Sequence, residues 1–238
     1  MQRVLTEREI DKLNETFKKD SAYNILVYFL KMYKGKIRLS SSFGAEDQVL
    51  TDMMSKIDNS ASIFTLDTKR LHPETYDVMD ATNLKYKKTI DVYFPDTLSV
   101  EELCKTQGID GHYESIEKRK NCCSVRKIEP LRRALDGFDI WITGLRADQS
   151  VTRTQTPFIE YDDNFKIIKL NPIIGWKHDD VWDYIKENNV PYNKLHDQGF
   201  PSIGCAPCTR AVEDSEDIRS GRWWWENPEH KECGLHIK

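Results

Sequence analysis

Lys36-Ile-Arg-Leu-Ser-Ser-Ser-Phe-Gly-Ala-Glu-Asp47 is the stretch that decides the fold, because it passes from a short apolar segment through small residues into a helical pattern. Residues 36–39 predict a strand, and apolar side chains recur at helical spacing over residues 46–57. The small residues between them let a ligand approach the backbone, and the amides that begin the helix favour an anion. The loop lacks the Gly-Lys-Ser/Thr ending of a Walker A loop, and a serine-rich turn that only caps the helix is the alternative interpretation.

Strands and helices alternate along the rest of the chain, which predicts an α/β fold with a mostly parallel, Rossmann-like sheet flanked by helices. Thr6 begins the first helix with a capping box, because Glu9 stands three residues after it. We expect residues 1–210 to form this domain and residues 211–238 to form a flexible tail. The other strands are expected over 62–66, 87–91, 140–143 and 167–170, and the helices over 6–18, 21–33, 73–83, 98–135 and 178–188.

Polar loops follow three of these strands at the point where each strand ends. They are residues 40–47, Asp67-Thr-Lys-Arg70 and Gly144-Leu-Arg-Ala-Asp-Gln-Ser150. In open parallel sheets, ligands bind beyond the carboxyl ends of the strands. The three loops therefore predict one ligand site on a single rim of the sheet.

The overall charge and the termini exclude several classes of function. The chain has 238 residues and a net charge of −4, so it is not a general nucleic-acid coat, which would be basic. The charged N-terminus has no apolar signal-peptide core, and no segment reaches the roughly 20 apolar residues of a membrane span. We therefore expect a cytoplasmic protein that binds neither nucleic acid nor membrane. In that compartment, clustered cysteines indicate a metal or catalysis rather than disulfides.

Two groups of cysteines suit a metal centre. Cys122-Cys123 and Cys205-Ala-Pro-Cys208 together offer four thiolates, which can hold a tetrahedral zinc ion or a [4Fe–4S] cluster. Adjacent cysteines reach one small ion poorly but can reach different corners of a cluster, so the spacing favours the cluster. Four unrelated buried thiols are the alternative interpretation. The isolated Cys104 falls in a predicted helix and is interpreted as structural.

A basic run surrounds the first cysteine pair and locally reverses the sign of the net charge. Within residues 118–133 only Glu129 is acidic. A solvated helix face is the usual explanation of such a run, but an anionic ligand beside the cysteines would need the same charges. The basic residues are Lys118, Arg119, Lys120, Arg126, Lys127, Arg132 and Arg133.

The last cysteine has the features of a nucleophile. Cys233 stands in Lys231-Glu-Cys-Gly-Leu-His236, a polar segment too short to form a core element. A thiol beside glycine near a chain end can move into and out of a pocket, whereas a surface cysteine without a role is the alternative interpretation. His236, Arg219 and Arg222 are near it in the sequence, and such cations favour the thiolate form of a cysteine.

Taken together, these motifs resemble the assimilatory sulfonucleotide reductases, and more narrowly the bacterial adenylyl-sulfate (APS) reductases that carry an iron–sulfur cluster. The resemblance extends from Ser40 to His236, and the combination is specific although each loop motif alone is weak. The first loop departs slightly from its relatives, which often have Ser-Phe-Ser-Gly or Ser-Ser-Gly, so the serine that contacts the nucleotide stays open. The matching motifs are Ser-Phe-Gly-Ala-Glu-Asp at 42–47, Leu-Asp-Thr with Leu-His-Pro-Glu-Thr-Tyr at 66–76, Cys-Cys-x-x-Arg-Lys-x-x-Pro at 122–130, Gly-x-Arg-x-Asp-Gln-Ser at 144–150, Cys-x-x-Cys at 205–208 and Glu-Cys-Gly-Leu-His at 232–236.

The resemblance implies an adenine-nucleotide α-hydrolase-like fold, a [4Fe–4S] cluster, and thioredoxin or glutaredoxin as the electron donor. It implies reduction of APS to sulfite and AMP through an S-sulfocysteine on Cys233, in sulfate assimilation and cysteine biosynthesis. Lys127 would lie between cluster and substrate. The cluster ligands would be Cys122, Cys123, Cys205 and Cys208. The phosphosulfate would lie among Arg146, Arg153, Arg219, Arg222 and His236, and the adenosine against Ser41, Ser42, Gly44, Asp47, Leu66 and Gly144.

Three other interpretations stay open at the level of sequence. The substrate could be 3′-phosphoadenylyl sulfate (PAPS), or both nucleotides, but family members without the paired cysteines typically use PAPS, which favours APS here. An ATP pyrophosphatase of the PP-loop class would need a Ser-Gly-Gly-x-Asp-Ser loop, which the chain lacks. A zinc-binding module would leave the loop arginines and residues 232–236 without a role. A homo-oligomer is compatible with the sequence, which defines neither the oligomeric state nor the role of Trp223-Trp-Trp225.

Overall fold

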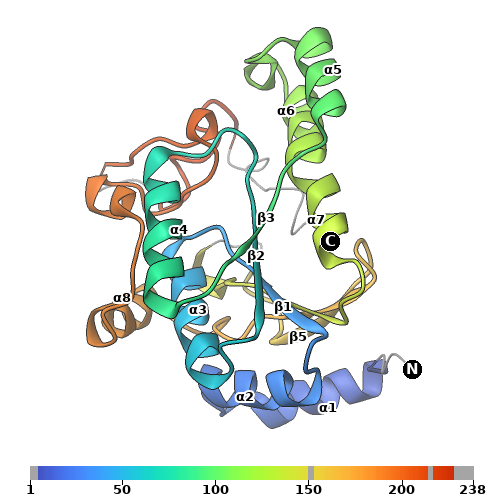
Figure 1. The fold of residues 1–238 in the computed structure, drawn as a ribbon, viewed down its shortest axis with the longest axis vertical. Coiled ribbons are helices and arrows are strands. Elements are labelled where there is room, and N and C mark those ends of the chain that lie inside the picture. Colours follow the sequence, from blue (N-terminus) through green and yellow to red (C-terminus); the bar gives the residue numbers. More distant parts are fainter. Residues whose placement is uncertain (1–4, 150–152, 214–216, 228–238) are drawn as a thin grey trace.

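The computed structural model describes residues 5–149, 153–213 and 217–227. Within these residues the centre is a six-stranded sheet in the order β3-β2-β1-β4-β6-β5 (Figure 1). Neighbouring strands are parallel except for β5 and β6, which are antiparallel, so the predicted α/β fold with a mostly parallel sheet is confirmed. The strands are β1 (Ile37–Ser40), β2 (Ser62–Leu66), β3 (Asp91–Tyr93), β4 (Ile140–Ile142), β5 (Ile159–Asp162) and β6 (Ile167–Leu170).

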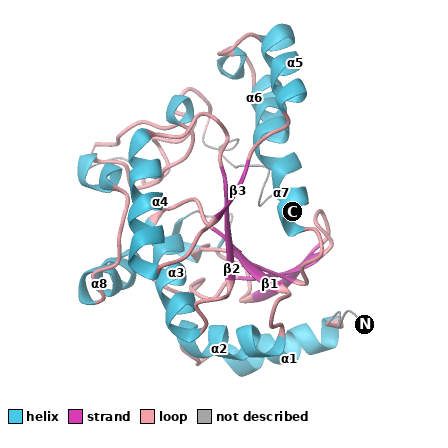
Figure 2. Cartoon of the chain, viewed as in Figure 1, coloured by secondary structure: helices cyan, strands magenta, loops and turns pink. Residues whose placement is uncertain are grey.

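Helices pack around this sheet, as Figure 2 shows. The predicted capping box is present at the first helix, where the Thr6 side chain accepts from the Glu9 N–H and the Glu9 carboxylate accepts from the Thr6 N–H. The predicted helices are found within a few residues of their expected ends, except that the segment predicted over 98–135 is divided into three separate helices, α5, α6 and α7. The helices are α1 (Glu7–Phe17), α2 (Ala22–Met32), α3 (Ala45–Ile57), α4 (Pro73–Tyr86), α5 (Thr97–Gln107), α6 (Ile116–Cys123), α7 (Glu129–Leu135) and α8 (His178–Glu187).

Successive side chains of the central strands point to opposite faces, and each face has its own apolar core. In β4, Ile140 and Ile142 belong to the larger core with α1, α2, α3 and α8, whereas Trp141 belongs to the smaller core with α7. The same alternation puts Ile63 and Phe64 of β2 on opposite faces. A sheet covered on both faces leaves its strand ends as the place where a ligand can reach it.

Two strands differ from the sequence prediction. The strand predicted over 87–91 is displaced, because β3 begins only at Asp91. Lys87 ends α4 with a left-handed φ of 50°, so the chain turns there instead of entering the sheet. The edge strand β5 is not predicted at all, because its Glu160 faces the buried Lys169 of β6 at 3.6 Å, and such charges mask the hydropathy pattern of a strand.

A π-helical turn joins α6 to α7. Ser124–Ile128 form it, and the N–H of Glu129 donates to the carbonyl of Ser124. Pro130 follows and has no N–H, so a regular α-helical hydrogen-bond ladder cannot continue through this point. The two helices and the turn form one column beside the sheet, continued upward by α5 (Figure 1). Turns of this kind are frequent at functional sites. This one directly follows the cysteine pair and contains Lys127.

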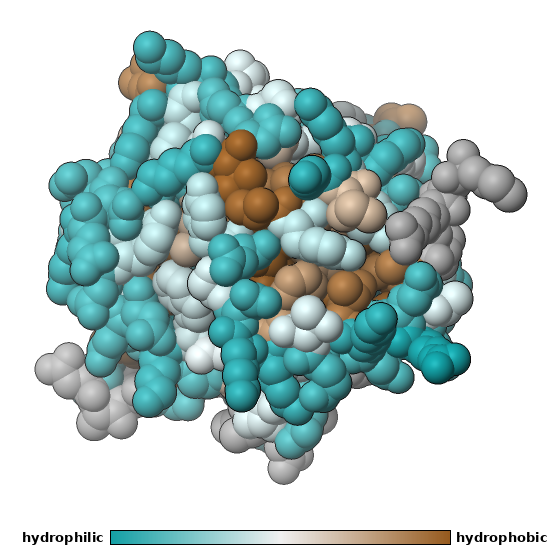
Figure 3. Space-filling view, turned by 90° about the horizontal axis from the view of Figure 1, so that it is seen from below, coloured by the Kyte–Doolittle hydropathy of each residue, from teal (hydrophilic) through white to brown (hydrophobic). Residues whose placement is uncertain are grey.

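The side of the molecule that carries α1 and α2 exposes apolar surface. Figure 3 views the molecule from below and shows apolar side chains among hydrophilic ones. On α2, Tyr23, Val27, Tyr28 and Met32 are between 38% and 47% exposed. No helix among the described residues is long and apolar enough to cross a membrane.

Candidate active site

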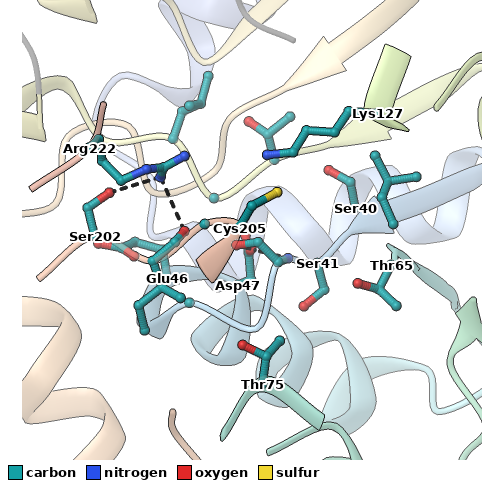
Figure 4. Close-up of a pocket in the computed structure, with 18 of the residues that line it drawn as sticks. Ser40, Ser41, Glu46, Asp47, Thr65, Thr75, Lys127, Ser202, Cys205 and Arg222 are labelled. Carbon is teal, nitrogen blue, oxygen red and sulfur yellow. Dashed lines mark hydrogen bonds between the residues drawn. The ribbon is translucent and has the colours of Figure 1, made fainter. Parts of the chain in front are cut away.

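A cavity of about 220 Å³ lies at the carboxyl ends of β1, β2 and β4. The three polar loops that follow these strands all contribute to its wall, so they meet at one rim of the sheet (Figure 4). The strand ends add hydroxyl groups and apolar surface. The lining residues predicted from sequence are Ser41, Ser42, Gly44, Asp47, Leu66 and Gly144, and the structure adds Ser40, Thr65, Leu131, Trp141 and Thr143.

The first loop is held in an unusual backbone conformation. Phe43 has a φ of 59°, a left-handed value that costs about 1–2 kcal/mol for a residue with a side chain. Its side chain is only 1% exposed, and its N–H donates to the Ser41 Oγ at 3.2 Å. Burial and hydrogen bonding therefore hold a strained turn in place, and Gly44 then caps α3 without a side-chain hydrogen bond.

Asp47 ties the first loop to the loop after β4. Its Oδ2 accepts from the N–H and the hydroxyl of Ser42, at 2.6 and 2.7 Å. Gly144 packs so close that a Cβ there would lie 2.4 Å from the Asp47 Oδ1. Asp47 is 9% exposed, so it acts on the cavity mainly by shaping these two loops.

Asp47→Asn is expected to remove a pH dependence of the stability. Burial raises the pKa of Asp47 from 3.8 to about 6, against hydrogen bonds from Ser42 that lower it. Between those values the folded chain binds more protons than the unfolded chain, so this carboxyl reduces stability as the pH rises through about 6. In urea denaturation from pH 5 to 7.5, the free energy of unfolding of the wild type should fall by roughly 1–2 kcal/mol relative to Asp47→Asn. A constant difference between the two proteins would contradict the raised pKa.

Four cations line the same cavity. They are Lys127, Arg153, Arg219 and Arg222, as the sequence predicts. Arg153 and Arg222 are only 8% and 7% exposed, so their guanidinium groups are held rather than solvated. Figure 4 shows Lys127 and Arg222 pointing toward one another, with Cys205 between them. Such a group of cations suits an anion with several oxygens, such as a phosphate or sulfate.

Arg146 is predicted at the same anion but does not line the cavity. Its Nε donates to the Glu46 Oε1 at 2.9 Å, and its Nη1 contacts Asp148. The side chain is 2% exposed, and the two carboxylates offset its charge. In this structure Arg146 therefore supports the wall of the cavity from behind, and its contact with a ligand stays a prediction.

Arg222 depends on a glycine for its position. Its Nη1 donates to the Ser202 hydroxyl and to the Ile203 carbonyl, at 3.3 and 3.2 Å (Figure 4). The guanidinium lies directly on Gly204, where a Cβ would be 2.4 Å from the Arg222 Nη2. Its central carbon also lies 4.8 Å from the centre of the Trp223 ring. The guanidinium is thus in close contact with both a backbone that lacks a side chain and an indole ring.

A second, smaller cavity adjoins the first and contains all four paired cysteines. Cys122 and Cys123 reach it from the end of α6, and Cys205 and Cys208 reach it from a short 3-10 turn. Lys127, Cys205 and Arg222 line both cavities. Among the described residues, no three His, Cys, Asp or Glu side chains are close enough together to hold a single metal ion. 

Three residues that line the second cavity have buried hydrogen-bond donors without an acceptor. Among the described residues, the Nε groups of Arg126 and Arg222 and the Nε1 of Trp223 are buried without a hydrogen-bond partner. In the part of the chain that the structure describes, no carboxylate lines this cavity. Buried polar groups normally have partners, so a space with cations, free N–H groups and thiols fits an anionic group that accepts hydrogen bonds.

The cysteine thiols would have to lose protons to bind a metal. Burial raises the pKa of Cys122, and it raises the pKa of Cys208 to about 12, so both are protonated near neutral pH when no metal is bound. The Cys205 Sγ already lies 3.2 Å from the Thr68 hydroxyl. Metal binding releases such protons, so a metal here would replace thiols by thiolates.

For several residues of the site, the sequence predicts no individual role. Gln149 and Glu46 line the first cavity from within two predicted loop motifs. Arg119 lies over the buried Trp223 at 4.6 Å and forms a buried ion pair with Glu226 at 2.6 Å. Trp223 therefore forms part of the wall of the second cavity, and a charge run with an aromatic run gave the only hint of this pairing.

Two predicted site residues, Cys233 and His236, lie outside the described residues. The boundary predicted at residue 210 is crossed by close contacts. Thr209 pairs with Arg222 in an antiparallel bridge, and the Arg210 N–H donates to the Gly221 carbonyl at 3.0 Å. The segment that follows residue 210 thus returns to the site in its described part.

The sheet, the rim cavity and its cations define an α/β protein of the nucleotide-binding type. The chain belongs to the phosphoadenosine phosphosulfate reductase domain family, whose model matches residues 36–211. It is 50% identical over 200 residues to proteins named adenosine 5′-phosphosulfate reductase from Allochromatium vinosum and Neisseria meningitidis serogroup B. These alignments cover 84% of this chain and 78% and 81% of those proteins.

Solved structures agree with this family assignment. A phosphoadenylyl-sulfate (PAPS) reductase from Candida auris, solved as a phosphate complex, is similar with a TM-score of 0.76 and 31% identity, over 89% of this chain and 100% of that chain. An FMN adenylyltransferase from Candida glabrata has a TM-score of 0.54 at 16% identity, over 93% of this chain and 83% of that one, and shares the fold alone.

Proposed function

We propose that this protein reduces adenylyl sulfate to sulfite and AMP, with thioredoxin or glutaredoxin as the electron donor. The observation that carries the proposal is the cavity in which Lys127, Arg153, Arg219 and Arg222 lie beside hydroxyl and apolar groups at the strand ends. An adenosine suits the strand ends, and a phosphosulfate suits the cations. The relatives named adenosine 5′-phosphosulfate reductase support this substrate.

In the first step, the Cys233 thiolate attacks the sulfur of the substrate. A bond forms between the cysteine sulfur and the sulfate sulfur, the bond from that sulfur to the bridging oxygen breaks, and AMP leaves with the electron pair. Lys127 and Arg222 offset the charge of the sulfate and the charge that grows on the phosphate. The product is an S-sulfocysteine on the enzyme.

In the second step, a thiolate of the electron donor attacks the Cys233 sulfur. Sulfite leaves, a mixed disulfide forms, and the second thiol of the donor resolves it. The donor dithiol is thereby oxidised to a disulfide, and these two electrons reduce the sulfate sulfur to sulfite. The sulfite would then enter sulfate assimilation and cysteine biosynthesis.

We further propose that Cys122, Cys123, Cys205 and Cys208 hold a [4Fe–4S] cluster. The buried free N–H groups of Arg126, Arg222 and Trp223 support it, because the sulfurs of a cluster accept hydrogen bonds. When bound, a cluster with four thiolates supplies negative charge that orients neighbouring cations, and both substrate electrons still come from thiols. Lys127 lines both cavities, so its positive charge would interact with the ligand in each of them.

Cys208→Ser is expected to lose most of the iron. Wild-type protein purified without oxygen should contain iron and acid-labile sulfide, because the four thiols supply a complete ligand set. The matched control is Cys104→Ser, since Cys104 lies in α5 and lines neither cavity. Metal analysis by mass spectrometry, with a sulfide assay, checks both. Zinc in place of iron in the wild type would contradict the cluster.

The reaction itself is tested with purified wild-type protein, thioredoxin and adenylyl sulfate. Sulfite and AMP should appear in equal amounts. Release of pyrophosphate from ATP without sulfite would contradict the proposal and indicate an adenylylating enzyme instead.

The second candidate substrate is PAPS, and the similarity to the Candida auris PAPS reductase favours including it. The relatives at 50% identity are named for adenosine 5′-phosphosulfate, which makes APS the first choice. The ratio of kcat/KM for the two nucleotides decides between a single substrate and dual specificity.

A further inference from the structure

Gln149 connects two parts of the cavity wall through one amide. Its Nε2 donates to the Glu46 Oε1 at 2.9 Å, and its Oε1 accepts from the Arg153 Nη1 at 2.8 Å and from the Arg146 backbone N–H at 3.4 Å. All three side chains line the first cavity. The amide is therefore used in both directions, as a donor toward α3 and as an acceptor from an anion-facing arginine.

The anchor of this chain of contacts is rigid. Glu46 also accepts from the Arg146 Nε at 2.9 Å, and Arg146 is 2% exposed. Glu46 itself stands in the first turn of α3, so its carboxylate is fixed by a helix and by a buried guanidinium. Gln149 thus connects Arg153 to a fixed point rather than to a mobile side chain.

Few side chains other than glutamine can make this connection. A carboxylate at position 149 would accept from Arg153 but would face the carboxylate of Glu46 as a like charge. An apolar side chain of the same length would make neither hydrogen bond. Because position 149 lies between a carboxylate and a guanidinium, it needs a side chain that both donates and accepts a hydrogen bond, as an amide does.

We propose that Gln149 is a positioning residue that holds the Arg153 guanidinium toward the anionic part of the nucleotide. Arg153 has a long side chain with many rotamers, and a fixed acceptor selects among them before the ligand arrives. This inference rests on the proposed function, because it takes the anion to be the phosphate or phosphosulfate of an adenine nucleotide.

The test compares the binding of AMP with the binding of adenosine, each in competition with a fluorescent nucleotide. Gln149→Met keeps the length of the side chain and removes its hydrogen bonds to Glu46, Arg153 and the Arg146 backbone, so AMP should bind on the order of tenfold more weakly. Adenosine carries no anion, and its affinity should not change. The exposed Gln198 does not line the cavity, so Gln198→Met is the matched control. Gln149→Asn, one methylene too short to reach both partners, should behave as Gln149→Met does and serves if that variant does not fold.

A double-mutant cycle shows whether Gln149 acts through Arg153. In the Arg153→Met background, Gln149→Met should weaken AMP binding no further, because the guanidinium to be positioned is gone. Equal losses for AMP and adenosine, or fully additive losses in the cycle, would overturn the inference. If the wild type binds AMP and Gln149→Met binds it equally well, only this inference fails. If the wild type binds neither AMP nor adenosine, the proposed function fails with it.

Discussion

Cys233→Ser is expected to abolish the release of sulfite from adenylyl sulfate. The mechanism requires a thiolate that can form a bond to the sulfate sulfur and later release it, and a serine hydroxyl does neither at neutral pH. Cys233 follows Arg222 by eleven residues, and that length of chain spans at most roughly 36–40 Å when extended. Arg222 lies in the cavity wall, so this length of chain is enough for Cys233 to reach the sulfur of a substrate bound in the cavity.

The decisive measurement is the mass of the intact protein after incubation with adenylyl sulfate and no electron donor. Wild type and Cys104→Ser should gain one sulfonate group, and Cys233→Ser should gain none. Because iron content and AMP binding report the two cavities, both should stay at the wild-type level in Cys233→Ser. A sulfonate adduct on that variant would assign the nucleophile to another cysteine.

Gly204→Ala is expected to lower kcat/KM for adenylyl sulfate by on the order of 10²-fold, the usual loss when one stabilising donor is removed from a developing charge. The new methyl group would lie 2.4 Å from the Arg222 Nη2, so the guanidinium has to leave its place. The neighbouring Trp223 ring, whose centre is 4.8 Å from the guanidinium carbon, limits the room for that movement. The guanidinium would then lose the position in which it lines both cavities.

The matched control is Gly175→Ala, because a Cβ at Gly175 would meet nothing within 4 Å. Its activity and its melting temperature should stay at the wild-type values. For Gly204→Ala, the melting temperature tells a displaced arginine from a protein that does not fold. A kcat/KM equal to that of the wild type would mean that Arg222 is not needed where the structure has it.

The fold could be predicted largely from sequence because most side chains of the central strands are apolar on both faces of the sheet, with Arg38 and Lys169 as buried exceptions. β2 and β6 begin and end at the predicted residues, since short, mostly apolar runs such as Ile167-Ile-Lys-Leu170 are typical of strands buried on both faces. β5 could not be predicted, because its strand character comes from pairing with Lys169, a contact between chain segments. The sequence pattern also placed β3 too early in the chain, because the left-handed turn at Lys87 depends on how α4 ends.

The cavity lining could be predicted where a motif follows a strand, as for Ser42, Asp47 and Gly144. The roles within the wall could not be predicted, because they depend on distances. Arg146 carries the same charge as Arg153, yet its carboxylate partners hold it behind the wall. Gly204 has no chemistry of its own, and its importance appears only when Arg222 is seen lying on it.

The wall that the two cavities share has a thermodynamic consequence. Lys127, Cys205 and Arg222 face both spaces, so a ligand in one cavity changes the energy of the groups that meet a ligand in the other. Such coupling is reciprocal: whatever factor one ligand applies to the affinity of the second, the second applies to the first. If the nucleotide and the cluster bind as proposed, their binding is therefore coupled, and the affinity for each depends on the occupancy of the other.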